Sequence, residues 1–259
     1  MSAEAAGDVL SQALLLAEEK PLEAVIHLPK IAGIDISLNM MVITMFISVI
    51  LIILFIMFAS KKPKLVPGPM QNLAEAIILF IRDSVVMEMM GKNGLPWIPF
   101  LTTIFLFILF NNMLGLIPGL GTPTSSIYVT FALAMVVFFS IHITGVVKHG
   151  PAKYFKALVL PGGAPVWLAP LFVPLEIISA FAKPFSLMVR LFANMFAGHT
   201  VMVVFIGLIL LYGSYVIAPF PLILSVAVGL LEIGFKILQA YVFTVLSAMY
   251  IGDALHGGH

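Results

Sequence analysis

Long uncharged, apolar stretches alternate with short polar or Pro/Gly-rich segments along most of the chain. A helix needs about 20 apolar residues to cross the hydrocarbon core of a bilayer. The first such stretch, 36–60, ends at the basic Lys61-Lys62-Pro63-Lys64. The next, 93–147, is too long for one helix, and Asn111-Asn112 and the Pro/Gly-rich residues 116–126 divide it. The pattern predicts three spans, at about 36–60, 96–115 and 124–147.

Two longer apolar stretches follow, at about 171–213 and 217–252. Each is about twice the length of an upright span, so each must be strongly tilted or kinked. The turn between them, near 213–221, predicts a helical hairpin. Residues 66–92 show the pattern of an amphipathic helix that lies in the membrane interface. The sequence therefore predicts an all-α membrane protein with about five transmembrane helices and one interfacial helix.

Composition supports the same class. Of the 259 residues, 61% are hydrophobic and 10% are charged, against about 45–50% and about 25% in soluble domains. These values exclude a soluble enzyme, a disordered protein and a nucleic-acid-binding protein. Acidic residues gather within 1–35, which we expect to form an N-terminal extramembrane segment before a single membrane domain, 36–259. The sequence contains no cysteine and no phosphate-binding loop, so we expect no disulfide, no nucleotide site in this chain and no cofactor.

The distribution of basic residues predicts the orientation in the membrane. Five Lys or Arg residues lie within 61–95 and three within 148–160, whereas the turns near 116–123 and 213–221 contain none. Loops rich in Lys and Arg remain on the cytoplasmic side. With five spans, the N-terminus is expected outside and the C-terminus in the cytoplasm.

Several ionisable or amide side chains interrupt the last two apolar stretches. An Arg at the centre of a bilayer costs at least about 2.5–3.5 kcal/mol, so such residues usually face water or a partner. Arg190 lies well inside its stretch, whereas Lys183 could equally reach the interface with its long side chain. The four-residue spacing places Ser186, Arg190 and Asn194 on one helix face. These side chains are Glu176, Lys183, Arg190, His199, Glu232, Lys236 and Gln239, and Ser186 and Asn194 are the polar neighbours of Arg190 on its face.

The polar residues of the two stretches are related by the expected hairpin. Glu232, Lys236 and Gln239 share one stripe of the final helix. A hairpin centred near residue 215 places two residues at equal depth when their numbers sum to about 430. Polar groups that meet at several depths of an apolar hairpin indicate a wet or mobile interface. The register gives three such pairs: Arg190 with Gln239, His199 with Glu232, and Glu176 with Asp253.

Other histidines are expected to be structural. His142, inside the third span, is expected to pack or to hydrogen-bond between helices, although a proton-carrying role stays open. His149 beside Lys148 is expected to be solvated at the interface. The histidines of the C-terminal tail fit a solvated end better than a metal site.

The hairpin residues resemble a known family. The run Pro184-Phe-Ser-Leu-Met-Val-Arg-Leu-Phe-Ala-Asn-Met-Phe-Ala-Gly-His199, followed by Leu238-Gln-Ala-Tyr-Val-Phe-Thr-Val-Leu246, closely resembles subunit a of the F-type ATP synthase. Asn112-Met-Leu-Gly-Leu-Ile-Pro118 resembles its second-span signature. The resemblance implies a bacterial inner-membrane subunit whose two long, tilted helices curve against a rotating ring of c subunits. It also implies contacts with the peripheral stalk subunit b, the remaining ATP synthase subunits and lipid.

The same resemblance implies roles for single residues. Arg190 corresponds to the essential stator arginine of the family, and Gln239 corresponds to its facing glutamine. Ser186 and Asn194 match polar neighbours of that arginine, and Glu176 matches the carboxylate of the cytoplasmic access channel. Arg190 would lie between two proton paths and prevent a direct leak.

The outer path shows two departures from the family pattern. The family usually carries one acid and one histidine at the positions of His199 and Glu232, and this chain keeps that pair. Gly115 stands where many members carry an acid. Lys236 stands where an uncharged residue is expected, and one turn from Glu232 it would hold that carboxylate ionised and modulate the outer channel. The outer path is therefore expected to rely on Asn111, Asn112, His199 and Glu232.

The residues by themselves leave two rival functions open. A secondary transporter also places charges at mid-membrane, but it normally shows internal repeats, which we do not find in this sequence. A structural membrane scaffold needs neither Arg190 nor the depth-matched pairs. The sequence does not determine whether H⁺ or Na⁺ is carried.

Overall fold

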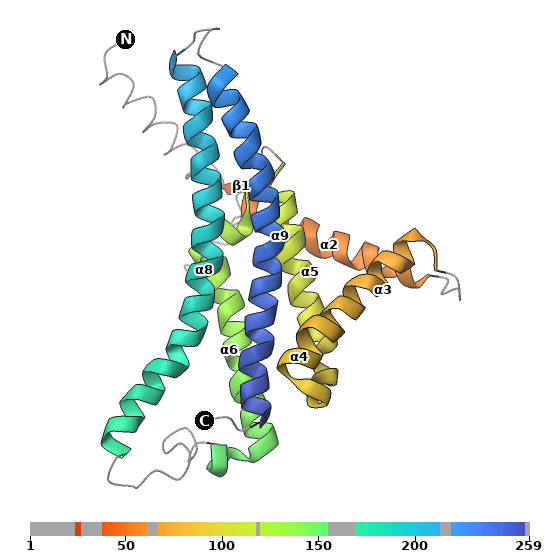
Figure 1. Ribbon diagram of the computed structural model, residues 1–259, viewed down its shortest axis with the longest axis vertical. Helices are drawn as coiled ribbons and strands as arrows, with labels where there is room; N and C mark the ends of the chain where they lie inside the picture. The colour runs from red at the N-terminus through yellow and green to blue at the C-terminus, as the bar shows by residue number, and fades with distance from the viewer. Residues whose placement is uncertain are drawn as a thin grey trace. The chain divides into compact units, whose positions relative to one another are not determined.

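The computed structural model describes residues 24–26, 38–61, 67–117, 120–154, 169–212 and 219–256, most of them helical (Figure 1). Strand β1 (Ala24–Ile26) pairs antiparallel with β2 (Leu38–Asn39). The helices are α2 (Met40–Ser60), α3 (Pro69–Ile81), the π-helix η1 (Arg82–Val86), α4 (Met87–Met89), the 3-10 helix η2 (Gly91–Trp97), α5 (Ile98–Leu114), the 3-10 helix η3 (Pro123–Ser125), α6 (Ile127–His149), α8 (Ala169–Tyr212) and α9 (Pro219–His256).

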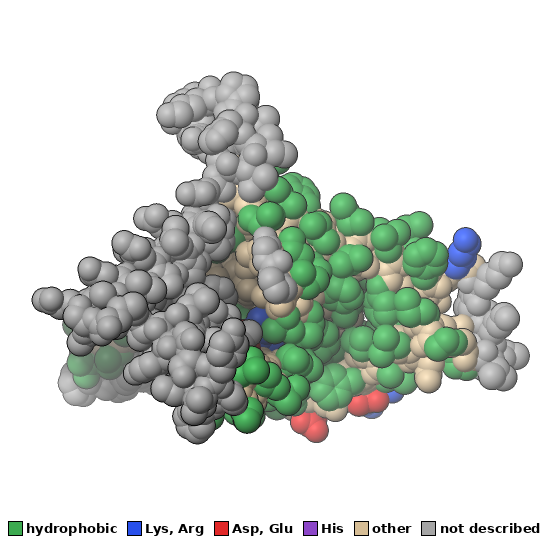
Figure 2. Space-filling view, turned by 90° about the horizontal axis from the view of Figure 1, so that it is seen from above, with side chains coloured by type: hydrophobic (Ala, Val, Ile, Leu, Met, Phe, Trp, Pro, Cys, Tyr) green, Lys and Arg blue, Asp and Glu red, His purple; other side chains and the backbone are tan. Residues whose placement is uncertain are grey.

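The prediction of an all-α membrane protein is confirmed. Large hydrophobic side chains point outward on α2, α6, α8 and α9, and they dominate the described part of the face in Figure 2. Val147 on α6 is 79% exposed, and the contiguous apolar surface around such residues suits contact with lipid. Within the described residues, four segments are long and apolar enough to cross a membrane: Met40–Ser60, Gly91–Leu114, Ile127–His149 and Leu222–His256.

The two longest helices occupy the two long apolar stretches of the sequence. α8 has 44 residues and α9 has 38. At about 1.5 Å per residue these helices extend about 66 Å and 57 Å, roughly twice the hydrocarbon thickness of a bilayer. Both helices must therefore tilt, or extend beyond the hydrocarbon. α8 also contains Pro174 and Pro184, and each proline removes one backbone hydrogen bond from the helix.

The start of α2 is determined by a cap. The expected span began at residue 36, whereas the helix begins at Met40. Leu38 and Asn39 are held in strand β2, and the backbone N–H of Val42 donates to Asn39 Oδ1 at 2.9 Å. An asparagine in this position satisfies an N–H that the first turn leaves without a helical partner.

The expected interfacial helix at 66–92 is interrupted. α3 ends at Ile81, and the π-helical turn η1 separates it from α4. Ile81, Val85, Val86 and Met90 are all 0% exposed. In an unbroken α-helix Met90 would lie on the face opposite Ile81. The wider π-turn brings all four side chains to the core, which explains the interruption.

The chain divides into two compact units. Unit 1 contains Met1–Ile52, Phe107–Ser126 and Phe192–Gln239, and unit 2 contains Ile53–Leu106, Ile127–Leu191 and Ala240–His259. α8 and α9 each contribute residues to both units. Of the polar stripe expected on the final helix, Glu232, Lys236 and Gln239 belong to unit 1, and Tyr250, which lies on the same stripe, belongs to unit 2.

Aromatic contacts connect the helices of unit 2. Phe138 of α6 stacks on Phe181 of α8, with 5.6 Å between ring centroids. Phe80 of α3 lies 5.4 Å from the ring of Tyr241 on α9 and 6.5 Å from that of Phe105 on α5. The interfacial segment is therefore packed against the membrane helices of this unit.

Candidate functional site

The first half of α9 turns a polar stripe inward and an apolar face outward. Glu232, Lys236 and Gln239 are 7%, 3% and 5% exposed, whereas Phe235 and Leu238 are each 52% exposed. A helix of a water-soluble protein shows the reverse arrangement. The four- and three-residue spacings place the three polar groups on one side. The predicted stripe is therefore buried within unit 1.

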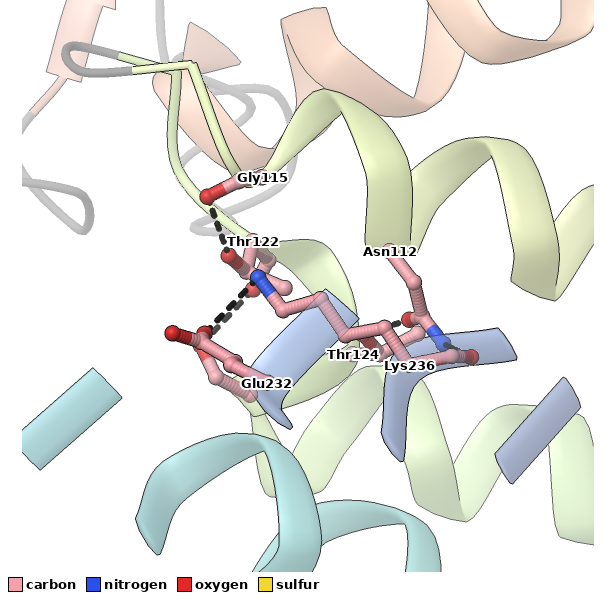
Figure 3. Close-up of polar contacts among 7 residues, drawn as sticks. Asn112, Gly115, Thr122, Thr124, Glu232 and Lys236 are labelled. Atoms are coloured by element: carbon pink, nitrogen blue, oxygen red, sulfur yellow. Dashed lines mark hydrogen bonds and ion pairs between the residues drawn. The ribbon is translucent and has the colours of Figure 1, made fainter. Parts of the chain in front are cut away.

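Glu232 and Lys236 form a buried ion pair (Figure 3). Lys236 Nζ lies 2.9 Å from Glu232 Oε1. The second carboxylate oxygen, Oε2, is buried and has no hydrogen-bond partner among the described residues. The predicted pairing of Lys236 with Glu232 is confirmed. It leaves one oxygen of the carboxylate available to a proton or to water.

A second polar contact holds the end of α5 against α9 beside this ion pair. Asn112 Nδ2 donates to the backbone oxygen of Lys236 at 3.0 Å, and Thr124 Oγ1 donates to Asn112 Oδ1 at 2.6 Å (Figure 3). Asn112 and Thr124 are both 0% exposed. The two bonds orient the amide and tie the Pro/Gly-rich segment to α9. Sequence reasoning missed Thr124, because its role depends on a contact with a different element.

Thr122 fills the space beside Gly115. Thr122 Oγ1 donates to the backbone oxygen of Gly115 at 3.3 Å, and a Cβ on Gly115 would lie 2.7 Å from Thr122 Cβ. Real side chains do not approach this closely, so position 115 accepts a side chain only if the loop moves. The neighbouring Asn111 is 0% exposed. Its Nδ2 donates to the backbone oxygen of Phe107 at 2.7 Å, and its Oδ1 has no partner within the described ranges.

A cavity of about 220 Å³ lies beside the ion pair, lined by the halves of α8 and α9 that belong to unit 1. Asn194, Glu232 and Lys236 form its polar lining. The rest of its lining is apolar, with Met195, Ala197, Val201, Val228, Leu231 and Phe235 beside Gly198. A Cβ on Gly198 would lie 3.2 Å from Glu232 Cγ, so α8 and α9 meet at this level in the predicted register.

Arg190 lies on α8 within unit 2 and is exposed. Leu187 and Leu191 on either side of it are 1% and 0% exposed, so the helix packs one face and turns the guanidinium outward. Ser186, one turn earlier, is also exposed, and Asn194, one turn later, is half-buried. Among the described residues, no carboxylate forms an ion pair with Arg190.

Three predicted site contacts stay predictions. Arg190 and Gln239 belong to different units, so their pairing rests on the sequence register. Gln239 Nε2 is buried without a partner in the described part of the chain. Glu176 and His199 are residues of α8, and their side chains lie outside the described residues.

Asp253 has a cationic partner at the cytoplasmic end expected for the hairpin. Lys183 Nζ lies 3.9 Å from Asp253 Oδ2 and 5.5 Å from the centre of the Tyr250 ring. Lys183 is therefore held by α9 within unit 2. The register set Asp253 opposite Glu176, and that pairing stays a prediction, because the Glu176 side chain lies outside the described residues.

Both internal histidines have a hydrogen-bond partner in the structure. His142 Nδ1 lies 2.7 Å from the Tyr154 hydroxyl, so its predicted hydrogen-bonding role is confirmed. His149 is half-buried, and its Nε2 lies 3.1 Å from the backbone oxygen of Ala254, so its predicted solvation stays a prediction. This partner is a main-chain atom 105 residues away, and no side-chain pattern in the sequence indicates it.

The fold and the site define a multi-pass helical membrane protein that buries an ion pair, amide side chains and a cavity between apolar helices. The family model described as ATP synthase A chain matches residues 41–252. The chain is 43% identical to ATP synthase subunit a of Parvibaculum lavamentivorans over 234 residues, which cover 88% of this chain and 89% of that protein. It is 42% identical to ATP synthase subunit a of Methylobacterium sp. over 246 residues (93% and 96%) and 44% identical to that of Pelagibacter ubique over 230 residues (89% and 93%). The chain belongs to the ATP synthase A chain family, as the resemblance predicted.

Proposed function

We propose that this chain is the proton-translocating stator subunit of a bacterial F-type ATP synthase, and that it couples proton flow past a ring of c subunits to ATP synthesis. The observation that carries the proposal is Arg190, an exposed guanidinium on a long apolar helix with no acidic partner among the described residues. A guanidinium stays protonated, and inside a membrane it needs an anionic partner. The carboxylate of a passing c subunit is such a partner.

The outer proton path of this proposal runs along Asn112, His199 and Glu232, with Asn111 beside it. Its support is the buried polar cluster of unit 1, in which Oε2 of Glu232 has no hydrogen-bond partner among the described residues and serves in the proposal as the proton acceptor. The proposal places the water that delivers the proton beside Asn194, Glu232 and Lys236, the polar residues of the adjoining pocket. The proton then passes to the carboxylate of a c subunit.

The inner path opens near Glu176 toward the cytoplasm. A c-subunit carboxylate that has taken up a proton is neutral, so it can travel through lipid, where its ionised form would be too costly. When it returns to Arg190, the positive charge favours its ionised form and drives the proton into the inner path. In this proposal the guanidinium also repels a proton that would cross directly, and Ser186, Asn194 and Gln239 take the roles that the family resemblance gives to polar partners of the stator arginine.

The chain inserts in this proposal with its N-terminus outside and its C-terminus in the cytoplasm. Residues 1–35 form an extramembrane segment before one membrane domain, 36–259. The c-ring contacts the Arg190 face, subunit b of the peripheral stalk holds the chain against rotation, and ATP is made on other subunits of the complex.

Replacement of Arg190 tests the proposal. The variant Arg190→Ala should assemble but lose ATP-driven proton pumping in inverted membrane vesicles, with assembly checked by copurification of the c-ring and the soluble ATPase. Arg190→Lys should fail nearly as completely, because an ammonium lacks the planar fork and loses its proton more readily when desolvated. Val189→Ala, at the adjacent exposed position, is the matched control and should pump normally. Normal pumping by an assembled Arg190→Ala complex would contradict the proposed mechanism.

A further inference from the structure

Lys236 places a positive charge inside the polar cluster of unit 1, in addition to that of Arg190 in unit 2. Its side chain is 4% exposed, and that of Glu232 is 7% exposed. Burial of two charges is costly unless each is paired and hydrogen-bonded. Lys236 is the one basic group within 4 Å of the Glu232 carboxylate among the described residues. The lysine is therefore the counter-ion of this acid in the described structure.

We infer that Lys236 is a tethered counter-cation, a positioning residue that occupies Glu232 Oε1 and leaves Oε2 as the single atom through which this carboxylate accepts and returns protons. The inference rests on the proposed function, because it refines the outer proton path. A buried carboxylate without such a side chain would need a free cation as its counter-ion, and Lys236 supplies that charge from within the chain.

The surroundings of the pair support this assignment. α8 presents the neutral Asn194 and Gly198 to the cavity beside the pair, and the neutral Asn112 of α5 contacts the backbone of Lys236. Asn112 donates to the backbone oxygen of Lys236 and so helps to hold this turn of α9 in place. Glu232 Oε1 is used by the ammonium, whereas Oε2 has no partner within the described ranges. Thus Oε1 of the Glu232 carboxylate binds the ammonium, and in this inference Oε2 exchanges protons.

Removal of the tether should leave Glu232 in need of another partner. Without the ammonium, the buried carboxylate either retains a proton or recruits another cation. The space vacated by the side chain joins a cavity that already measures about 220 Å³. A small planar cation such as guanidinium can enter such a space and donate two parallel hydrogen bonds to a carboxylate. Tetramethylammonium carries the same charge but has no N–H to donate.

The test is respiration-driven ATP synthesis in inverted vesicles that contain the complete complex. Vesicles are prepared in guanidinium chloride or in tetramethylammonium chloride at equal ionic strength, so that the salt reaches both faces of the membrane. The chains compared are the natural one, Lys236→Ala and the conservative control Lys236→Arg, with rates normalised to assembled complex. If Lys236→Ala does not assemble, Lys236→Met takes its place, since it keeps the length of the side chain without the charge.

In tetramethylammonium, Lys236→Ala should be slower than the natural chain by about tenfold or more, because a buried charge has lost its partner. Guanidinium should restore most of that loss in Lys236→Ala and leave the natural chain and Lys236→Arg unchanged. A Lys236→Ala rate equal to that of the natural chain, or a loss that guanidinium does not reduce, would overturn the inference. Either result leaves the Arg190→Ala test unaffected, so the proposed function and this inference fail independently.

Discussion

The Asn112 network allows a quantitative test of how unit 1 is held together. The perturbation is Asn112→Leu, which keeps a similar side-chain shape and removes both polar atoms of the amide. The structure assigns two hydrogen bonds to that amide, at 3.0 Å to the Lys236 backbone and at 2.6 Å from Thr124. Asn111→Leu is the matched control, since Asn111 is equally buried but makes one local bond, to the backbone oxygen of Phe107.

The expected cost is set by these bonds. Side-chain hydrogen bonds between membrane helices contribute about 0.6 kcal/mol on average and up to about 1.7 kcal/mol each. The substitution also leaves the Thr124 hydroxyl buried without its acceptor, which adds about 1 kcal/mol or more. The backbone oxygen of Lys236 lies inside α9 and keeps its helical hydrogen bond, so loss of the bond from Asn112 costs little at this atom. Asn112→Leu should therefore destabilise the fold by about 2–3 kcal/mol, and Asn111→Leu by less than about 1 kcal/mol.

Thermal release of this chain from the purified complex measures the difference. For a chain of this size, about 2–3 kcal/mol lowers the midpoint by roughly 5–10 °C. The double variant Asn112→Leu/Thr124→Val should be more stable than the sum of its two single variants predicts, by about 1 kcal/mol, because both partners of one bond are then apolar. Equal shifts for Asn111→Leu and Asn112→Leu, or strict additivity in the double variant, would refute the assigned network.

Two further predictions concern the Pro/Gly-rich segment after α5. Gly115→Ala should lower the same midpoint by an amount equivalent to about 1–3 kcal/mol, because its Cβ overlaps Thr122, and Thr122→Gly should recover part of this loss. Gly68→Ala, where nothing lies within 4 Å of the added Cβ, is the control, and an equal effect there would count against the argument. Leu120→Cys, introduced into a chain without cysteine, should react with a membrane-impermeant maleimide only from outside, and Lys148→Cys only from the cytoplasm. Labelling of position 120 from the cytoplasmic side would contradict the proposed orientation.

The sequence by itself determined the protein class and the polar stripe of α9. Both depend on properties that are local along the chain: the length of an uncharged stretch, the cost of a charge in lipid and the 3.6-residue repeat. Glu232 and Lys236 are one turn apart on a single helix, and this spacing predicted that they pair. The structure gives 2.9 Å between Lys236 Nζ and Glu232 Oε1. The level at which Gly198 meets Glu232 was also predictable, because a short turn constrains the register of a hairpin near its tip.

The tertiary structure alone decided the contacts between elements that are distant in sequence. Thr124 and Asn112 act together because the segment after α5 folds back against α9, and Thr122 fills the space beside Gly115 for the same reason. The π-turn after Ile81 brings Val86 and Met90 to the core. The position of the core relative to this segment depends on tertiary packing, so the helical periodicity of the sequence does not predict the turn. Far from the hairpin tip, Lys183 lies 3.9 Å from Asp253, a contact that depends on side-chain reach and that the equal-depth register did not predict. These features depend on distances in space, and one-dimensional patterns do not record such distances.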